Sequence, residues 1–173
     1  MGTSEQPHEA DPVVAIYRRA LPQVYGYLLP RCGSAVIAED LTAETFLAAV
    51  SARRQGSVAE VNVAWLVGVA RHKLVDHWRR VAREERNLAV AEQMSDGLDD
   101  PWVDYLDSAV VHASLARLSA HQRAALTLRY LDGLQVREVA EYLDRSVHAT
   151  ETLLVRARAA LRRVYREEES RDA

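Results

Sequence analysis

The side chains that could do chemistry are spaced for binding nucleic acid and not for catalysis. The six histidines are scattered, with no His-x-x-x-His pair, and the single cysteine, Cys32, has no partner for a disulfide or a thiolate metal site. The chain contains no glycine-rich phosphate loop and no nucleophile elbow. We therefore expect no enzymatic activity, no bound metal and no cofactor.

Residues 63–88 interleave basic and aromatic side chains on one predicted helix. Trp65, Leu66, Val69 and Trp78 fall at helical spacing on its apolar side. The other side carries polar and charged residues, namely Arg71, His72, Asp76, His77, Arg79, Arg80 and Arg83. Such a face suits single-stranded nucleic acid, because each base stacked on a ring contributes ~1–3 kcal/mol. For the two tryptophans, a position in the core is the interpretation that we favour.

Residues 133–163 predict two helices that meet at a tight corner. Apolar side chains at helical spacing mark the inward faces, at Leu134, Val136, Val139 and Leu143 and again at Leu153, Leu154, Ala157 and Leu161. Asp144 and Arg145 interrupt this pattern, and Ser146 can cap the second helix. Two interpretations stay open from this stretch alone. It is either a helix-turn-helix whose second helix enters a DNA major groove or an ordinary corner in a helical core.

The net charge of −3 conceals two basic segments. Residues 64–86 carry six basic and three acidic side chains, and residues 113–166 carry ten and five. Residues 81–107, which overlap the first of these segments, carry two basic and eight acidic side chains. Local charge decides phosphate contact, since screening limits its reach to about 10 Å at ~0.1 M salt.

The elements that must position these residues are all helices, so we expect an all-α fold. Predicted helices cover 13–29, 38–50, 63–88, 110–118, 120–131 and the two helices between 133 and about 167. Capping residues mark their starts at Asp11, Ser34, Ser119 and Ser146. Pro22 should kink or split the first helix. Residues 51–62 are expected to form a loop, with Arg53 and Arg54 at its entrance.

Nothing in the sequence predicts membrane insertion or export. No run approaches the ~20 apolar residues that span a bilayer. The N-terminal residues lack the basic start and apolar core of a signal peptide. We expect a cytoplasmic protein.

Four stretches, taken in order, resemble the extracytoplasmic-function (ECF) sigma factors, a group of the sigma-70 family of bacterial RNA polymerase subunits. They are AEDLTAETFLAAV (38–50), AWLVGVARHKLVDHWRR (64–80), LARLSAHQRAALTLRYLDGLQVREVAEYL (115–143) and LVRARAALR (154–162). The resemblance implies two small helical domains. Sigma region 2 would be residues 11–90, an acidic flexible linker residues 91–109, and sigma region 4 residues 110–168.

The resemblance also implies partners and roles. The partners would be core RNA polymerase, through its clamp and flap regions, and promoter DNA; many members are also held by an anti-sigma factor. Polymerase docking would fall to Asp40, Leu41, Glu44, Phe46 and Leu47. Contacts with the minus-10 element would fall to Arg53, Arg54, Arg71, His72, Asp76, His77, Arg79 and Arg80. Candidate contacts with the minus-35 element are Arg145, Ser146, His148, Thr152, Arg156 and Arg158.

The second domain departs from the family pattern in its turn and recognition helix. Asp144 and Arg145 stand where a Gly and an apolar residue are usual, although Asp tolerates a left-handed backbone better than most residues. Glu151 and Leu153 make the recognition helix poorly basic. We therefore expect it to attract phosphate weakly and to act as one of two tethered contacts.

Two other functions remain open at this stage. The chain could be a helix-turn-helix regulator that acts on duplex DNA without polymerase, or a sigma-like protein-interaction module. The first would leave the acidic face of 38–50 and the basic face of 63–88 without a role. The sequence does not determine the relative placement of the two domains, which a flexible linker would leave free until a partner fixes it.

Overall fold

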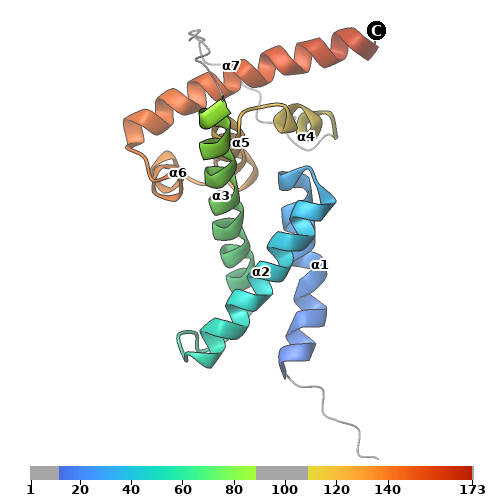
Figure 1. The fold of residues 1–173 in the computed structure, drawn as a ribbon, viewed down its shortest axis with the longest axis vertical. Coiled ribbons are helices and arrows are strands. Elements are labelled where there is room, and N and C mark those ends of the chain that lie inside the picture. Colours follow the sequence, from blue (N-terminus) through green and yellow to red (C-terminus); the bar gives the residue numbers. More distant parts are fainter. Residues whose placement is uncertain (1–11, 89–108, 173) are drawn as a thin grey trace, which may run out of the picture.

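The chain folds into two helical bundles (Figure 1). A computed structural model describes residues 12–88 and 109–172, and within these ranges every regular element is a helix. The first bundle consists of α1 (Pro12–Cys32), α2 (Ala35–Arg54) and α3 (Val63–Leu88). The second consists of α4 (Ala109–Ala116), α5 (Ala120–Leu126), the π-helical segment η2 (Thr127–Leu131), α6 (Val136–Leu143) and α7 (Val147–Asp172). The all-α prediction is confirmed for the described residues.

The three helices of the first bundle pack pairwise around one apolar core. The largest buried side chains are Leu28 of α1 and Leu66, Leu74 and Trp78 of α3, which confirms the core position for Trp78. Of the kink or split expected at Pro22, the split does not occur, because α1 runs without interruption from Pro12 to Cys32. Buried side chains on both sides of Pro22 hold the helix against α2 and α3, and this packing outweighs the lost backbone hydrogen bond.

Helix α2 begins as predicted and ends later. The hydroxyl of Ser34 accepts a hydrogen bond from the Ile37 N–H at 3.5 Å, so Ser34 is its N-cap. The loop expected over 51–62 is shorter, because residues 51–54 form the last turn of α2. Arg53 and Arg54 therefore sit on that last turn, where cations interact favourably with the helix dipole. Gly56, with φ 66°, begins the loop proper.

The second bundle is built on α7, against which α4, α5 and α6 pack. Ser119 caps α5 and Ser146 caps α7, each by accepting a backbone N–H on its hydroxyl. Helix α7 continues beyond the expected end near Glu167 and reaches Asp172. The predicted acidic linker 91–109 lies, except for its last residue, outside the described residues.

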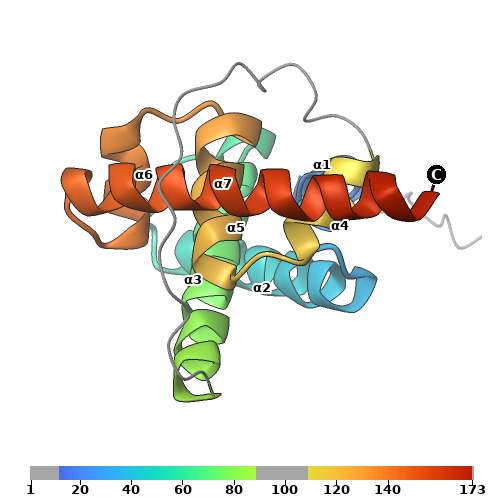
Figure 2. The ribbon, with the colours of Figure 1, turned by 90° about the horizontal axis from the view of Figure 1, so that it is seen from above.

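The two bundles are in contact with each other. Helix α3 packs against α5 and α6, and α1 touches α4. Figures 1 and 2 show α7 lying across the end of the first bundle, with α5 and α6 between α7 and α3. The sequence did not determine this placement, and in the structure specific polar contacts join the two bundles. Within 12–88 and 109–172, no helix has both the length and the apolar character needed to cross a membrane.

Candidate nucleic-acid interface

The polar face of α3 divides into an exposed part and a covered part. His72, Asp76 and Arg80 are exposed. Arg71 and Arg79 are half-buried, because the second bundle lies against them. Burial comes first, and the nearby Arg80 second, in lowering the pKa of His77. The Nδ1 atom of the neutral His77 ring lies 3.4 Å from the Nη2 atom of Arg80.

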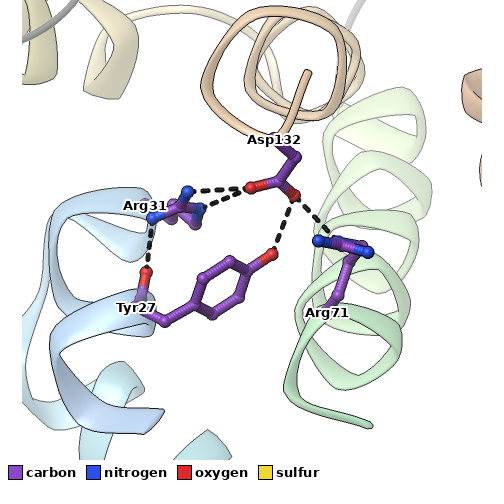
Figure 3. Close-up of polar contacts among 4 residues, drawn as sticks. All are labelled: Tyr27, Arg31, Arg71 and Asp132. Atoms are coloured by element: carbon purple, nitrogen blue, oxygen red, sulfur yellow. Dashed lines mark hydrogen bonds and ion pairs between the residues drawn. The ribbon is translucent and has the colours of Figure 1, made fainter. Parts of the chain in front are cut away.

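Asp132, from the second bundle, binds three side chains of the first bundle (Figure 3). Its Oδ1 accepts hydrogen bonds from Nε and Nη2 of Arg31, at 3.1 and 2.8 Å. Its Oδ2 accepts from the Tyr27 hydroxyl at 2.8 Å and from Nε of Arg71 at 3.0 Å. Only 1% of the Asp132 side chain is exposed. Both carboxylate oxygens are therefore fully engaged across the boundary between the bundles.

Two of the donors to Asp132, Tyr27 and Arg31, also contact each other within the first bundle. Nη1 of Arg31 donates to the Tyr27 carbonyl at 2.9 Å, and its guanidinium lies 4.0 Å from the centre of the Tyr27 ring. Burial first, and the Asp132 carboxylate second, raise the pKa of the Tyr27 hydroxyl well above its ordinary value. The hydroxyl is therefore protonated at every physiological pH and acts as a donor.

Tyr142 of α6 makes a second contact with the same face of α3. Its ring lies 4.8 Å from the His72 ring, centroid to centroid, and 5.9 Å from the guanidinium of Arg71. Arg79 donates from Nη2 to the Tyr142 carbonyl. Three residues expected to meet the minus-10 element, Arg71, His72 and Arg79, are thus engaged by the second bundle.

A third contact joins the C-terminal part of α3 to the start of α5. The Glu85 carboxylate accepts the Ala120 N–H, at 3.3 and 3.1 Å for its two oxygens. A carboxylate at this end of a helix is favourable, because the first backbone N–H groups lack helical partners.

The helix-turn-helix is well formed despite its unusual turn. Asp144 adopts the left-handed conformation, with φ 53° and ψ 52°, as the sequence allowed. The Arg145 N–H donates to the Ala140 carbonyl at 3.0 Å, which closes the turn after α6. The Ser146 hydroxyl then accepts the Ala149 N–H at 3.1 Å. The second helix of the motif is the N-terminal half of α7.

The candidate contacts on α7 are not covered by the first bundle. Ser146, His148 and Arg156 are exposed, as is the acidic Glu151. Arg145, Thr152 and Arg158 are half-buried; Arg158 donates to the Tyr130 hydroxyl at 3.4 Å. The basic groups on this surface are few, as the sequence indicated.

The described residues hold no group of three or more metal-ligating side chains. Burial raises the pKa of the Cys32 thiol to about 11, so this cysteine is not a nucleophile at neutral pH. The polar groups that the fold does bring together at the boundary between the bundles are arginines, a histidine, the Tyr27 hydroxyl and the carboxylates of Asp132 and Glu85.

Comparison with known proteins identifies the family. Residues 16–84 match the family "Sigma-70 region 2", and residues 108–161 match "Sigma-70, region 4". The chain is 36% identical over 126 residues to the ECF RNA polymerase sigma factor SigC of Mycobacterium tuberculosis, an alignment that covers 72% of this chain and 68% of that protein. The chain belongs to the ECF sigma factors.

A further curated relative supports the same assignment, and a solved structure has a similar fold. The chain is 33% identical over 166 residues to the ECF RNA polymerase sigma factor BldN of Streptomyces coelicolor, which covers 92% of this chain and 62% of that protein. The chain thus spans less than two thirds of the length of BldN. Its fold resembles that of the sigma factor RpoE from Bartonella quintana, solved in complex with the anti-sigma factor NepR. The TM-score is 0.53 at 21% identity, and the match covers 87% of this chain and 94% of that one.

The docking surface expected of an ECF factor lies on the outer face of α2. Asp40 and Glu44 are exposed, and Leu47 is 67% exposed. Phe46 is partly buried, with its ring 4.7 Å from that of Tyr17. Leu41 does not fit the docking set, because it is 3% exposed and packs in the core. Next to this face, an open hollow of about 430 Å³ is lined by Tyr17, Leu21, Pro22, Tyr25, Glu39, Thr42 and Ala43.

Sequence reasoning missed the residues that join the two sigma regions. Tyr27, Arg31, Glu85 and Tyr142 carried no pattern beyond ordinary helix positions, and Asp132 was interpreted only as the end of a helix. The adjoining segment η2 is the one local feature of the described structure that marks Asp132 as unusual. Its i→i+5 bond, from the Asp132 N–H to the Thr127 carbonyl at 3.0 Å, adds a residue to the turn before Asp132.

Proposed function

We propose that this chain is an RNA polymerase sigma factor that binds core polymerase and directs promoter recognition and the initiation of transcription. The observation that carries the proposal is the presence of both sigma regions, in order, within one chain related to curated ECF factors. The well-formed helix-turn-helix and the basic face of α3 give each region a surface of suitable chemistry for DNA. Neither the described residues nor the family points to catalysis, so the chain would act as a non-enzymatic factor.

The surfaces divide the work as follows. Asp40, Glu44, Phe46 and Leu47 on α2 dock on the polymerase clamp, where exposed carboxylates and a leucine meet a basic and partly apolar partner. The loop after Arg53 and Arg54 and the polar face of α3 hold the unpaired strand of the minus-10 element. The start of α7 meets the minus-35 element in the major groove, near the polymerase flap. The domain limits 11–90, 91–109 and 110–168 belong to the same proposal.

The direct test combines the purified chain with core RNA polymerase. Co-elution on size exclusion, together with transcription from a promoter selected from genomic fragments, is the expected result. A chain that neither binds core polymerase nor displaces another sigma factor from it would overturn the proposal. Binding to free duplex DNA with site specificity and without polymerase would instead favour a helix-turn-helix regulator.

A variant pair separates docking from strand contact. Arg79→Ala with Arg80→Ala should slow promoter opening, measured by permanganate reactivity of unpaired thymines, while leaving polymerase affinity within about twofold, since surface charges far from an interface contribute little. Arg163→Ala with Arg166→Ala removes the same charge from an exposed part of α7 and serves as the control. Equal loss of opening and of polymerase binding would contradict the assignment of the α3 face.

The proposal also includes the location of the protein and a partner that would hold it inactive. We place the chain in the cytoplasm with the polymerase, and add an anti-sigma factor as a further partner, because the structural relative from Bartonella quintana was crystallised with one. Affinity purification of the tagged chain from its native cells should recover polymerase subunits. Stoichiometric recovery of a second small protein that polymerase displaces would identify the anti-sigma factor.

A further inference from the structure

The contact around Asp132 is asymmetric: all of its donors belong to sigma region 2 and its only acceptor belongs to region 4. Tyr27 and Arg31 lie on α1 and Arg71 lies on α3, whereas Asp132 follows η2 in the second bundle (Figure 3). If the bundles separate, the three donors remain together in region 2. We refer to Tyr27, Arg31 and Arg71 as the cradle.

The Tyr27 and Arg31 part of the cradle is preformed for binding an anion. Arg31 is fixed by its bond to the Tyr27 carbonyl and by the Tyr27 ring beneath it, independently of Asp132. The side chains of Arg31 and Arg71 keep 14% and 22% of their exposure even with Asp132 in place. Two guanidinium groups and a hydroxyl that converge on two oxygens suit a phosphate as well as a carboxylate, because both present paired, charged acceptor oxygens.

The position of the cradle identifies which phosphate it would meet. Arg71 and His72 are adjacent on α3, and the Tyr142 ring lies near both of them, on the face that region 2 is proposed to offer to the unpaired promoter strand. In this closed form, with the two regions in contact, the Tyr142 ring lies against the His72 ring and the Tyr142 carbonyl accepts a hydrogen bond from Arg79, while Asp132 fills the cradle. Region 4 therefore occupies both the ring-stacking and the charge-pairing positions of the same surface.

We infer that the cradle of Tyr27, Arg31 and Arg71 binds a backbone phosphate of the unpaired promoter strand, and that Asp132 occupies this site as an internal substitute when the two regions are closed. The nature of the strand rests on the proposed function. Tyr27 and Arg31 are then nucleic-acid contacts on α1, outside the surfaces so far assigned to DNA. Opening of the chain exposes the site, so binding of DNA by region 2 and contact between the regions exclude each other.

The test exploits two variants that break the same ion pair from opposite sides. Asp132→Asn weakens the closed form and leaves the cradle intact, whereas Arg31→Ala weakens the closed form and removes half of the cradle's charge. Binding of a fluorescent 12-residue oligothymidylate is followed by anisotropy at several salt concentrations, without polymerase. X-ray scattering records the radius of gyration, and circular dichroism checks the helices.

Both variants should increase the radius of gyration, but only Asp132→Asn should bind the oligonucleotide more tightly, roughly tenfold or more, as expected for a charge-assisted contact. The double variant, which combines Asp132→Asn with Arg31→Ala, should bind the oligonucleotide only as tightly as Arg31→Ala alone. The slope of log affinity against log salt should be steeper by about 0.7 for Asp132→Asn than for the double variant, the value for one phosphate of a single strand. Tyr27→Phe in the Asp132→Asn background should lose part of the gain.

The control is Arg19→Ala, which removes an exposed arginine from α1 outside the cradle. In the Asp132→Asn background it should preserve most of the gain, whereas Arg31→Ala abolishes it. Equal affinities for Asp132→Asn and Arg31→Ala, or an equal effect of Arg19→Ala and Arg31→Ala, would show that Asp132 only holds the regions together and would overturn the inference. Because polymerase is absent from this assay, its outcome is independent of whether the chain binds polymerase.

Discussion

The two surfaces assigned to DNA differ in what covers them. The region 2 surface on α3 is engaged by Asp132 and Tyr142, whereas the exposed start of α7 keeps Ser146, His148 and Arg156 in contact with solvent. Under the proposed function, the covered surface would bind unpaired DNA, which exists only after polymerase has opened a promoter. The open surface would bind duplex DNA but is weakly basic. We therefore expect neither region to bind DNA strongly in the free chain. In region 2 the contact with region 4 blocks the surface, and in region 4 the surface carries too few basic side chains.

The closed arrangement depends on buried charge, which makes it specific and easy to reverse. A buried ion pair adds little net stability, because desolvation offsets its attraction, but removing one partner leaves an uncompensated charge. The chain can thus close in one register and still open when a partner offers new contacts. Under the proposed function, polymerase docking on α2 would leave the α3 face free to receive DNA once the regions separate.

Charge reversal at Asp132 should have the largest effect, because it should uncover the region 2 surface and remove the difference between the two surfaces. Asp132→Lys would place a third cation against Arg31 and Arg71 and should disfavour the closed form by about 3–5 kcal/mol, the usual cost of an unpaired buried charge. Hydrogen exchange should then increase in α6 and at the face of α3, with no change at the start of α7. Glu141→Lys makes the same charge change on the exposed side of α6, and equal effects of the two variants would contradict the role of Asp132.

Loss of the α7 cap should affect the other surface alone. Ser146→Ala removes the hydroxyl that accepts the Ala149 N–H and should cost about 1 kcal/mol in the free energy of unfolding of the second bundle. Urea unfolding measures it. Asp144→Gly, at the left-handed turn residue beside it, should be neutral or slightly stabilising, because glycine adopts positive φ without strain. A cost for Asp144→Gly as large as that of Ser146→Ala would contradict the turn geometry.

Acid should weaken the contact between α3 and α5 by a smaller amount. Burial, followed by the nearby Arg145 and Arg86, lowers the pKa of His121, whose Nε2 has no partner among the described residues. The folded form therefore prefers the neutral ring, so its stability is complete above the pKa of the unfolded state, near 6.5, and falls as pH drops below it. Urea midpoints between pH 7.5 and 5.5 should decrease.

Substitution of the histidine tests whether that decrease comes from His121. His121→Gln should flatten the pH profile in part, with the remainder left to His77, whose pKa is lowered in the same direction. His148→Gln, at an exposed position of α7, should leave the profile unchanged. A profile that is equally steep in His121→Gln and in the unmodified chain would contradict this assignment.

The sequence predicts most of the fold, because helix caps and apolar spacing are local signals. Helix α3 has the predicted limits, and Ser34, Ser119 and Ser146 cap the helices they were expected to cap. The structure departs from these expectations in two helices. Pro22 lies within a continuous helix because buried residues on both sides fix it, and α7 extends to Asp172 beyond the expected stop.

The candidate site is less predictable, because its main feature joins residues that are far apart in the chain. Tyr27 and Asp132 are 105 positions apart, and no spacing rule links them. The basic side chains of α3 were found from their periodicity, but their engagement by Asp132 and Tyr142 is a property of the assembled bundles. Leu41 was placed in the docking set through the family resemblance, although its helical phase also fitted the core, where it lies.

The smallest expected effect on stability concerns Glu44, and it separates folding from docking. Its carboxylate lies 3.4 Å from the Lys73 ammonium, with 48% and 35% of the two side chains exposed, so the pair contributes at most about 0.5 kcal/mol to folding. Glu44→Gln should therefore leave the urea midpoint and the closed form unchanged while it weakens binding to core polymerase severalfold, with a loss that shrinks as salt is raised. Lys73→Gln breaks the same pair from the other side and should not weaken polymerase binding. If both variants weakened it equally, the ion pair, and not Glu44 itself, would be what polymerase requires, and the outer face of α2 would lose its assignment as the docking surface.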